Sequence, residues 1–151
     1  SKADVITPNI TEACFITGTE YRPAPHSDEF VSELIEKLSG LGPKIIAITG
    51  VSPDEEHVGI VARDNAAGKQ GSYMNVSHEG LFHGSGDVFA SSFAALLTRG
   101  ADVDTALKLA EGFVSDCIER TAKRNVPRHY GLDFESALPD YVKSIENSFA
   151  E

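Results

Sequence analysis

The chain has 151 residues, of which 41% are hydrophobic and 24% charged, and its 23 acidic against 13 basic side chains give a formal net charge of −10. This length and composition predict a single folded domain with a sizeable core. The few, scattered lysines and arginines argue against a nucleic-acid partner, and no apolar run reaches the roughly 20 residues of a membrane span. We therefore expect a small-molecule partner and neither nucleic acid nor membrane.

The two cysteines, Cys14 and Cys117, lie far apart in the sequence and in apolar surroundings. This predicts reduced core thiols of a cytoplasmic protein, not a disulfide or a metal pair. The first residues contain no apolar signal region and no initiator Met, and the chain opens almost directly into a predicted strand. We therefore expect a fragment of a longer chain.

A short β-branched run, residues 4–8, opens the chain and predicts a buried strand that ends at its proline. A helix is expected next, capped by Asn9 or Thr11, with Glu12 in its first turn. Its expected apolar side consists of Ala13, Phe15 and Ile16, and Thr17-Gly18 ends it. Residues 21–26, with two prolines, are expected to form a loop.

Residues 27–39 carry an apolar stripe at helical spacing, with acidic residues in the first turn and glycines after the last. The continuous apolar run over residues 43–51 predicts a central parallel strand that is covered on both faces. Residues 57–63 and 71–76 predict an antiparallel hairpin joined by a turn at residues 64–68.

The second half of the chain is predicted to be helical. A glycine turn precedes an apolar, alanine-rich segment at residues 88–97, which is expected to form a buried helix. Asp102 starts a long helix that ends near residues 123–125, and a last amphipathic helix is expected at about residues 139–149. The long helix has a predicted buried face that comprises Ala106, Ala110, Phe113, Val114, Cys117, Ile118 and Thr121.

Strands separated by helices predict an α/β domain with a mainly parallel sheet. Two parallel strands are too few for a sheet that helices this apolar could cover. We therefore expect the strand that begins at Asp4 to lie within a larger sheet, with neighbours supplied by residues outside this chain.

The turn His83-Gly84-Ser85-Gly86-Asp87 carries the clearest chemical signal. Unpaired amides at the start of a helix bind anions, and a first-turn carboxylate suits a residue that accepts a hydroxyl proton beside such an anion. The plainer interpretation is a short turn with an ordinary capping Asp. A Gly-x-Gly-Asp sequence also occurs in intramembrane aspartyl proteases, but the apolar run here is too short for a membrane span.

Two further polar elements follow predicted strands, where ligands bind in open α/β sheets. Asn9 with Glu12 could hold magnesium through water, although a helix cap explains the same pair. Thr49 with Gly50 could contact a phosphate, although a Thr-Gly strand end is as often a plain turn.

Three stretches, Asp4–Ala13 (DVITPNITEA), Ile48–Val51 (ITGV) and His83–Ala90 (HGSGDVFA), together resemble the ribokinase-like small-molecule kinases, and within them the pyridoxal and pyridoxamine kinases. The resemblance covers nearly the whole chain but corresponds to the C-terminal half of such an enzyme. It implies a partial three-layer α/β/α sandwich with a mainly parallel sheet, in which residues 1–151 form one ATP-binding, catalytic domain.

The resemblance also implies roles. Asp87 would be the catalytic base toward the substrate hydroxymethyl group, and the backbone amides of Gly84, Ser85 and Gly86 would form the anion hole. Asn9 and Glu12 would organise Mg²⁺ and the triphosphate of ATP, with Thr49 and Gly50 near the phosphates. The family more often has Thr where Ser85 stands, a departure of little consequence because the backbone N–H carries the role.

The implied activity is ATP-dependent phosphorylation of a vitamin B6 vitamer by the full-length enzyme, with little or no turnover by this chain alone. Members of this family are often dimers, so a homodimer is a further expectation. Two alternatives stay open: a hydroxymethylpyrimidine or sugar kinase of the same superfamily, and a non-catalytic fragment or binding module in which the glycine turn is only a helix cap.

Overall fold

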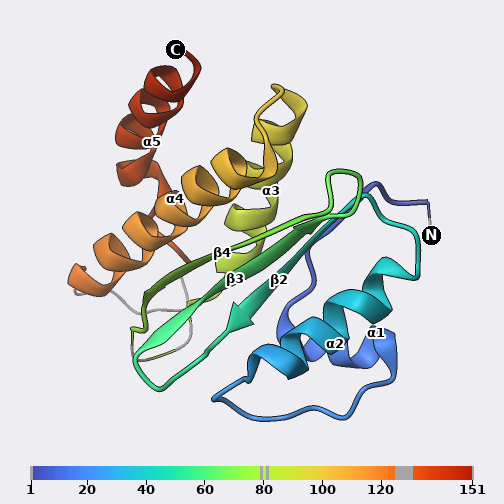
Figure 1. The fold of residues 1–151 in the computed structure, drawn as a ribbon. Coiled ribbons are helices and arrows are strands. Elements are labelled where there is room, and N and C mark those ends of the chain that lie inside the picture. Colours follow the sequence, from blue (N-terminus) through green and yellow to red (C-terminus); the bar gives the residue numbers. More distant parts are fainter. Residues whose placement is uncertain (1, 79, 81, 125–130, 151) are drawn as a thin grey trace. The chain divides into compact units, whose positions relative to one another are not determined.

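A computed structural model describes residues 2–78, 80, 82–124 and 131–150. The chain divides into two compact units, Ser1–Ser77 and His78–Glu151. The first unit contains β1 (Val5–Ile6), α1 (Ile10–Thr17), α2 (Asp28–Ser39), β2 (Ile45–Val51), β3 (His57–Asp64) and β4 (Lys69–Val76), and the second contains α3 (Ser85–Thr98), α4 (Val103–Lys123) and α5 (Phe134–Phe149) (Figure 1).

The sheet of the first unit has the order β1-β2-β3-β4. β1 and β2 are parallel, with Val5 opposite Ile45, whereas β2–β3 and β3–β4 are antiparallel. The predicted hairpin is confirmed, but within the described residues the sheet is mixed and not mainly parallel. The reason is the short connection over residues 52–56, which can join only antiparallel neighbours.

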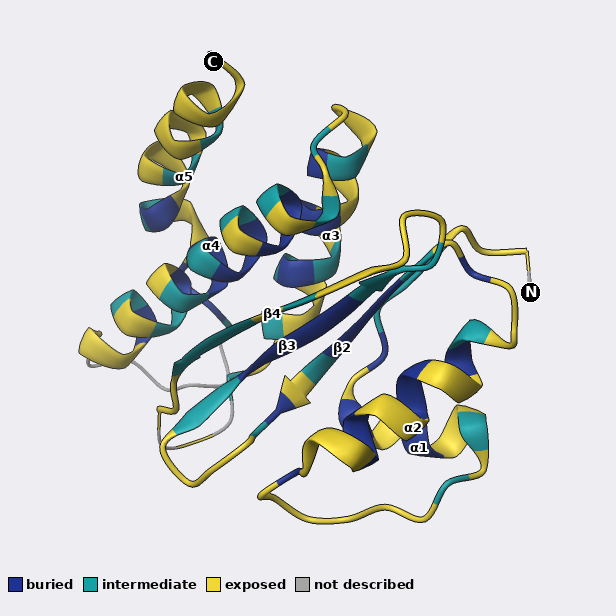
Figure 2. Ribbon diagram, in the orientation of Figure 1, coloured by how far each residue is buried: buried dark blue, intermediate teal, exposed yellow. Residues whose placement is uncertain are grey.

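Helices α1 and α2 lie on the same face of the sheet and pack against β2 (Figure 1). Ser27 caps α2 by accepting a hydrogen bond from Phe30 N at 3.3 Å, as its position before the apolar stripe predicts. Three consecutive residues of β2, 46–48, are fully buried (Figure 2). The core on the helical side comprises Ile10, Ala13, Cys14, Phe30, Val31, Leu34, Ile35, Leu38, Ile46, Ile48, Val51 and Val61.

The predicted apolar side of α1 is only partly right. Ile10, Ala13 and Cys14, at helical spacing, face the core, whereas the side chain of Phe15 is 89% exposed and that of Ile16 is 50% exposed. A helix of eight residues presents one narrow face to the sheet, and the two largest predicted core residues lie outside it.

The three helices of the second unit pack in series, α3 on α4 and α4 on α5. Asp102 caps α4 by accepting a hydrogen bond from Thr105 N at 2.7 Å, as predicted. α4 ends at Lys123, and Asn125, the last residue of its predicted end, lies outside the described residues. In contrast to the expectation of a buried helix, α3 buries one face only, because Phe89, Ser92, Phe93 and Leu96 are covered while Ala94 and Ala95 are exposed (Figure 2).

Helix α5 begins at Phe134, five residues before the predicted start at Pro139. A proline favours the first turn of a helix, which is why the sequence suggests a start there. The cap is instead Asp133, whose Oδ1 accepts a hydrogen bond from Ser136 N at 3.4 Å. Arg120 of α4 holds this first turn by donating to Ser136 O at 2.7 Å and pairing with Asp140 at 2.8 Å.

Cys14 and Cys117 are both buried free thiols, as predicted. Burial raises the pKa of each, that of Cys117 to about 11. None of the helices in the described ranges is both long and apolar enough to cross a membrane.

Candidate active site

Two of the three predicted polar elements meet at one corner of the first unit, where the parallel strands β1 and β2 end. Thr49 N donates a hydrogen bond to Pro8 O at 2.9 Å, and Asn9 forms an isolated parallel bridge with Thr49. Asn9 and Glu12, which start α1, therefore lie beside Thr49 and Gly50, which end β2. Carboxyl ends of parallel strands share one edge of a sheet, and this explains why residues 40 positions apart come together.

Asn9 and Glu12 form a reciprocal capping box. Asn9 Oδ1 accepts a hydrogen bond from Glu12 N at 2.8 Å, and Glu12 Oε2 accepts one from Asn9 N at 2.9 Å. The helix cap that the sequence suggests for this pair is therefore present in the structure. The start of α1 is satisfied by its own side chains.

The same pair retains the chemistry that a hydrated magnesium ion requires. Both side chains are exposed, and Glu12 keeps a carboxylate that can accept hydrogen bonds from water bound to the ion. No cluster of three or more His, Cys, Asp or Glu side chains suited to direct metal binding occurs among the described residues. The residues fit an ion held through water and not a closed protein cage.

Gly50 lies at an irregularity of the sheet. Thr49 pairs with Ile60 and Val51 with Gly59, so Gly50 is left out of the ladder between β2 and β3. Its φ is +71°, and a Cβ added there would meet nothing within 4 Å. The glycine is therefore required by backbone conformation and not by crowding, and Gly50 itself is exposed at the bulge while the next residue, Val51, is buried.

The third element, the glycine turn, starts α3 in the second unit. Gly84 is the N-cap residue with φ +90°, and Ser85, Gly86 and Asp87 form the first turn. Within the described part of the chain, no side chain caps this helix. Ser85 N makes a long hydrogen bond of 3.4 Å to Phe82 O, and the helix ladder begins with Val88 N donating to Gly84 O at 3.0 Å.

The first turn of α3 is open to solvent. Gly84, Gly86 and Asp87 are exposed, and a Cβ added at Gly86 would meet nothing within 4 Å. An anion can thus approach the backbone amides without displacing protein atoms, with the positive end of the helix dipole and the Asp87 carboxylate at the same place.

Core side chains hold both ends of the turn. Phe82 before it and Val88 after it pack against a cluster formed by Phe113 and Cys117 of α4, Leu132 before α5 and Ala137 of α5. Gly131, with φ +84°, lies beside the entry to the turn, since a Cβ there would be 3.8 Å from His83 O. These supports are not predictable from the sequence, because contacts between residues 82–88 and 113–137 leave no local pattern.

Basic residues near the end of α4 have structural partners. Lys123 pairs with Glu119 at 2.5 Å, and Arg124 Nε pairs at 2.7 Å with the buried carboxylate of Asp133. Asp133 N in turn donates to Thr121 Oγ1 at 2.8 Å. These contacts attach the start of α5 to the end of α4.

The sequence and the fold were compared with known proteins. The family model described as phosphomethylpyrimidine kinase matches residues 1–131. Pyridoxine kinase of Bacillus subtilis is 29% identical over 138 residues, which is 90% of this chain and 48% of that protein.

Two solved structures share the fold. A provisionally assigned phosphomethylpyrimidine kinase from Bacteroides thetaiotaomicron, crystallised with pyridoxal, has a TM-score of 0.85 at 29% identity, over 93% of this chain and 49% of that one. Pyridoxal kinase from Leishmania donovani in complex with ADP and pyridoxine has a TM-score of 0.75 at 26% identity, over 92% and 48%.

The chain spans about half the length of the curated relatives it matches, between 41% and 48%. The match nevertheless includes all three polar elements, since the family model extends over β1, the end of β2 and the glycine turn. The predicted ribokinase-like fold is confirmed, in its partial form. The chain belongs to the phosphomethylpyrimidine kinase family, among ribokinase-like kinases close to the pyridoxal kinases.

Proposed function

We propose that this chain carries the nucleotide-side half of a kinase that transfers the γ-phosphoryl group of ATP to the hydroxymethyl group of a vitamin B6 vitamer. The observation that carries the proposal is the start of α3, where an uncapped glycine turn and a first-turn carboxylate, Asp87, lie together at an exposed helix N-terminus. A helix start that serves stability alone ordinarily has an extended N-cap residue with a capping oxygen, whereas Gly84 has φ +90° and no side chain.

The chemistry follows from this arrangement. Asp87 accepts the proton of the substrate hydroxyl as that oxygen forms its bond to the γ-phosphorus and the bond from phosphorus to the ADP oxygen breaks. The amides of Gly84, Ser85 and Gly86 face the charge that develops on the transferred group. Phosphoryl transfer depends on placement and charge stabilisation more than on covalent catalysis, so one base and a set of amides suffice on this side.

The corner of the first unit, taken by itself, is the proposed contact for the metal ion and the phosphates. Glu12 and Asn9 would hold magnesium through its bound water, and Thr49 and the exposed backbone at Gly50 would contact phosphate oxygens. The ion, when bound, neutralises charge on the triphosphate. ATP as co-substrate is supported by the ADP in the Leishmania donovani structure.

We propose both the chemical class of the substrate and, within that class, a preferred compound. A hydroxymethyl group on a small heteroaromatic ring is common to B6 vitamers and hydroxymethylpyrimidine. We favour a B6 vitamer for two reasons. The Ile6-Thr7-Pro8-Asn9 motif resembles that of the vitamin B6 kinases, and the chain is similar to pyridoxine kinase of Bacillus subtilis. Hydroxymethylpyrimidine is the second candidate, favoured by the family model.

The test joins this chain to the half of Bacillus subtilis pyridoxine kinase that it does not match and measures ADP release from Mg-ATP. Pyridoxal, pyridoxine, pyridoxamine and hydroxymethylpyrimidine are offered in turn, and this chain alone is assayed in parallel. We expect turnover with a B6 vitamer in the joined protein and little or none with this chain alone.

The decisive variant is Asp87→Asn, expected to lower turnover by about 10²- to 10⁴-fold, the range for loss of a positioned base. The matched control is Asp104→Asn, which removes the corresponding exposed first-turn carboxylate from α4 and should leave turnover unchanged. A loss below tenfold for Asp87→Asn would remove Asp87 from the proposed role. Turnover with hydroxymethylpyrimidine alone would transfer the proposal to the second substrate.

A further inference from the structure

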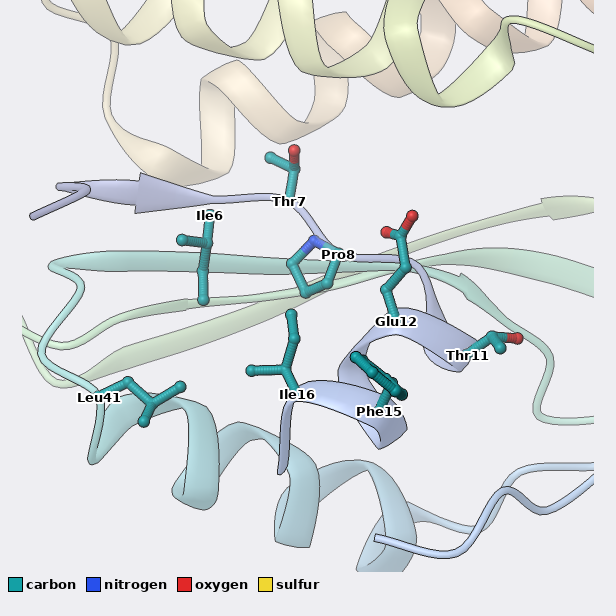
Figure 3. Close-up of a pocket in the computed structure, with 8 residues that line it drawn as sticks. All are labelled: Ile6, Thr7, Pro8, Thr11, Glu12, Phe15, Ile16 and Leu41. Atoms are coloured by element: carbon teal, nitrogen blue, oxygen red, sulfur yellow. The ribbon is translucent and has the colours of Figure 1, made fainter. Parts of the chain in front are cut away.

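The end of β2 is held from two sides. On the β1 side, Thr49 N donates a hydrogen bond to Pro8 O at 2.9 Å. Figure 3 shows Pro8 and Glu12 together at the start of α1, with the Glu12 carboxylate directed away from Phe15. The Pro8 bond fixes the chain up to Thr49, and the support beyond the Gly50 bulge comes from another part of the first unit.

His26, in the loop between α1 and α2, holds the chain beyond the bulge. Its backbone N donates a hydrogen bond to Ser52 O at 2.7 Å, and its side-chain Nδ1 accepts one from Ser52 N at 3.0 Å. One residue therefore satisfies both backbone groups of Ser52, as a neighbouring strand would. The bulge at Gly50, which is left out of the ladder between β2 and β3, lies between the Pro8 and His26 contacts.

The imidazole of His26 is itself held in place. The residue is 5% exposed, and its ring stacks on that of Phe30 with the centroids 6.0 Å apart and 29° between the planes. Phe30 belongs to the core of the first unit and to the first turn of α2, whose N-cap residue, Ser27, directly follows His26. The position of Ser52 is thus tied to the start of α2.

The hydrogen bond from Ser52 N determines which nitrogen of the ring is protonated. Because Nδ1 is the acceptor, the hydrogen of the neutral imidazole is on Nε2. Nε2 is buried, and no described residue accepts a hydrogen bond from it. A phenylalanine would fill the same space without that unsatisfied donor, so the particular contribution of the imidazole is the bond to Ser52 N.

We propose that His26 is a positioning residue for the phosphate contact at Gly50. The inference rests on the proposed function, in which the exposed backbone at Gly50 meets phosphate oxygens, and His26 acts through Ser52 without touching the substrate. When the Nδ1 bond is missing, the Ser52 peptide is free to turn and the bulge loses its support on one side. A phosphate must then order the Gly50 backbone as it binds, which weakens binding and leaves the proton transfer to Asp87 unaffected.

Two variants separate hydrogen bonding from packing. His26→Phe keeps an aromatic ring beside Phe30 but has no acceptor for Ser52 N. His26→Asn gives up the ring but carries Oδ1 at the same number of bonds from Cα as Nδ1, so it can accept the same hydrogen bond. If the Nδ1 bond carries the role, the asparagine variant retains function and the phenylalanine variant loses it, whereas a packing role gives the opposite order. Circular dichroism checks that both variants are folded.

The first measurement is NMR of this chain alone. In His26→Phe, the Ser52 amide should exchange with solvent about three- to tenfold faster, and the Gly50 amide resonance should shift. His26→Asn should return both toward their original values. The amide of Ile60, a buried residue of β3, should be unchanged in both variants.

The second measurement uses the joined kinase of the preceding section. His26→Phe should raise the KM for Mg-ATP by about three- to tenfold, the equivalent of one hydrogen bond, with kcat changed by less than about twofold. His26→Asn should leave the KM close to its original value. A residue that only stabilises the fold would lower the amount of active protein and leave the KM unchanged.

Two results would overturn the proposal. One is a His26→Phe chain in which the Gly50 resonance and the Ser52 exchange rate stay as they were. The other is a KM that rises in His26→Asn and not in His26→Phe, which would assign His26 to packing. A joined protein without turnover on any substrate would instead count against the proposed function, and the Gly50 and Ser52 amides would still decide whether His26 holds the end of β2.

Discussion

Helix α1 of the first unit and helix α3 of the second unit begin in opposite ways. α1 is closed by the reciprocal bonds of Asn9 and Glu12, at 2.8 and 2.9 Å, so its first amides are satisfied from within. α3 begins at Gly84 with no side-chain cap among the described residues. A side-chain cap stabilises the start of α1, whereas the start of α3 leaves backbone amides available, which is what the proposed anion hole requires.

The largest effect on stability is expected from Gly84→Ala. At φ +90°, an alanine is strained although nothing lies within 4 Å of its Cβ, and the cost is about 1–2 kcal/mol of the unfolding free energy. Urea unfolding measures it. A change within error would mean that the turn relaxes to a conformation other than the one described.

Asn9→Ala tests the capping box at the start of α1. Removal of the capping oxygen leaves Glu12 N unsatisfied and should lower the unfolding free energy of the first unit by about 1 kcal/mol. Asn9→Ser, which keeps a capping oxygen, is the matched control and should retain most of the stability. An equal loss in both variants would show that the box contributes little.

Gly86→Ala separates stability from anion binding. Gly86 lies in the first turn of α3 with open space at its Cβ, so alanine should stabilise the helix by about 0.5–1 kcal/mol. The added methyl group narrows the approach to the amides, so turnover of the joined kinase should fall. Gly112→Ala, inside α4 with equally open space, should stabilise without that loss. Unchanged turnover in Gly86→Ala would count against the anion hole.

An effect confined to alkaline pH is expected from the thiol of Cys117, whose pKa burial raises to about 11, with Asp116 and Asp133 also raising it and Arg120 lowering it. The folded pKa is higher than the value of 9.0 for a free thiol, so the protonated thiol favours the folded state below pH 9. That contribution is lost as the pH rises from 9 toward 11. Urea unfolding across this range should show the decline, and Cys117→Ala should reduce it.

Labelling of the two thiols with a disulfide reagent shows which unit has been loosened. Each unit contains one buried cysteine, Cys14 in the first and Cys117 in the second. Gly84→Ala should accelerate labelling of Cys117 alone, and Asn9→Ala labelling of Cys14 alone. Acceleration of both thiols by either variant would show that the units open together.

The sequence predicted those parts of the site that depend on local pattern. A β-branched run with a proline, followed by Asn-x-x-Glu, indicates the end of β1 and the start of α1. Gly-Ser-Gly-Asp before an apolar segment indicates the start of α3. The helix boundaries of α2 and α4 follow from Ser27 and Asp102 for the same reason.

What the sequence did not predict depends on tertiary contacts. Phe15 looked like core because it is apolar, but α1 is too short to turn that side chain toward the sheet. The start of α5 was misplaced because Pro139 resembles a first-turn proline, whereas Asp133 and the Arg120 contacts position it. The roles of the site residues and the extent of the domain remain predictions.

The fixation of the glycine turn at both ends bears on the thermodynamics of ligand binding. Phe82 and Val88 pack against one cluster, so the backbone between them is ordered before any phosphate arrives. Ordering the backbone of a free residue costs about 1–2 kcal/mol of conformational entropy. Because these residues are already ordered, that cost does not reduce the free energy of ligand binding. The entropy of the turn is lost once, during folding, so the affinity of the proposed anion hole would depend on the stability of the hydrophobic cluster that holds the turn.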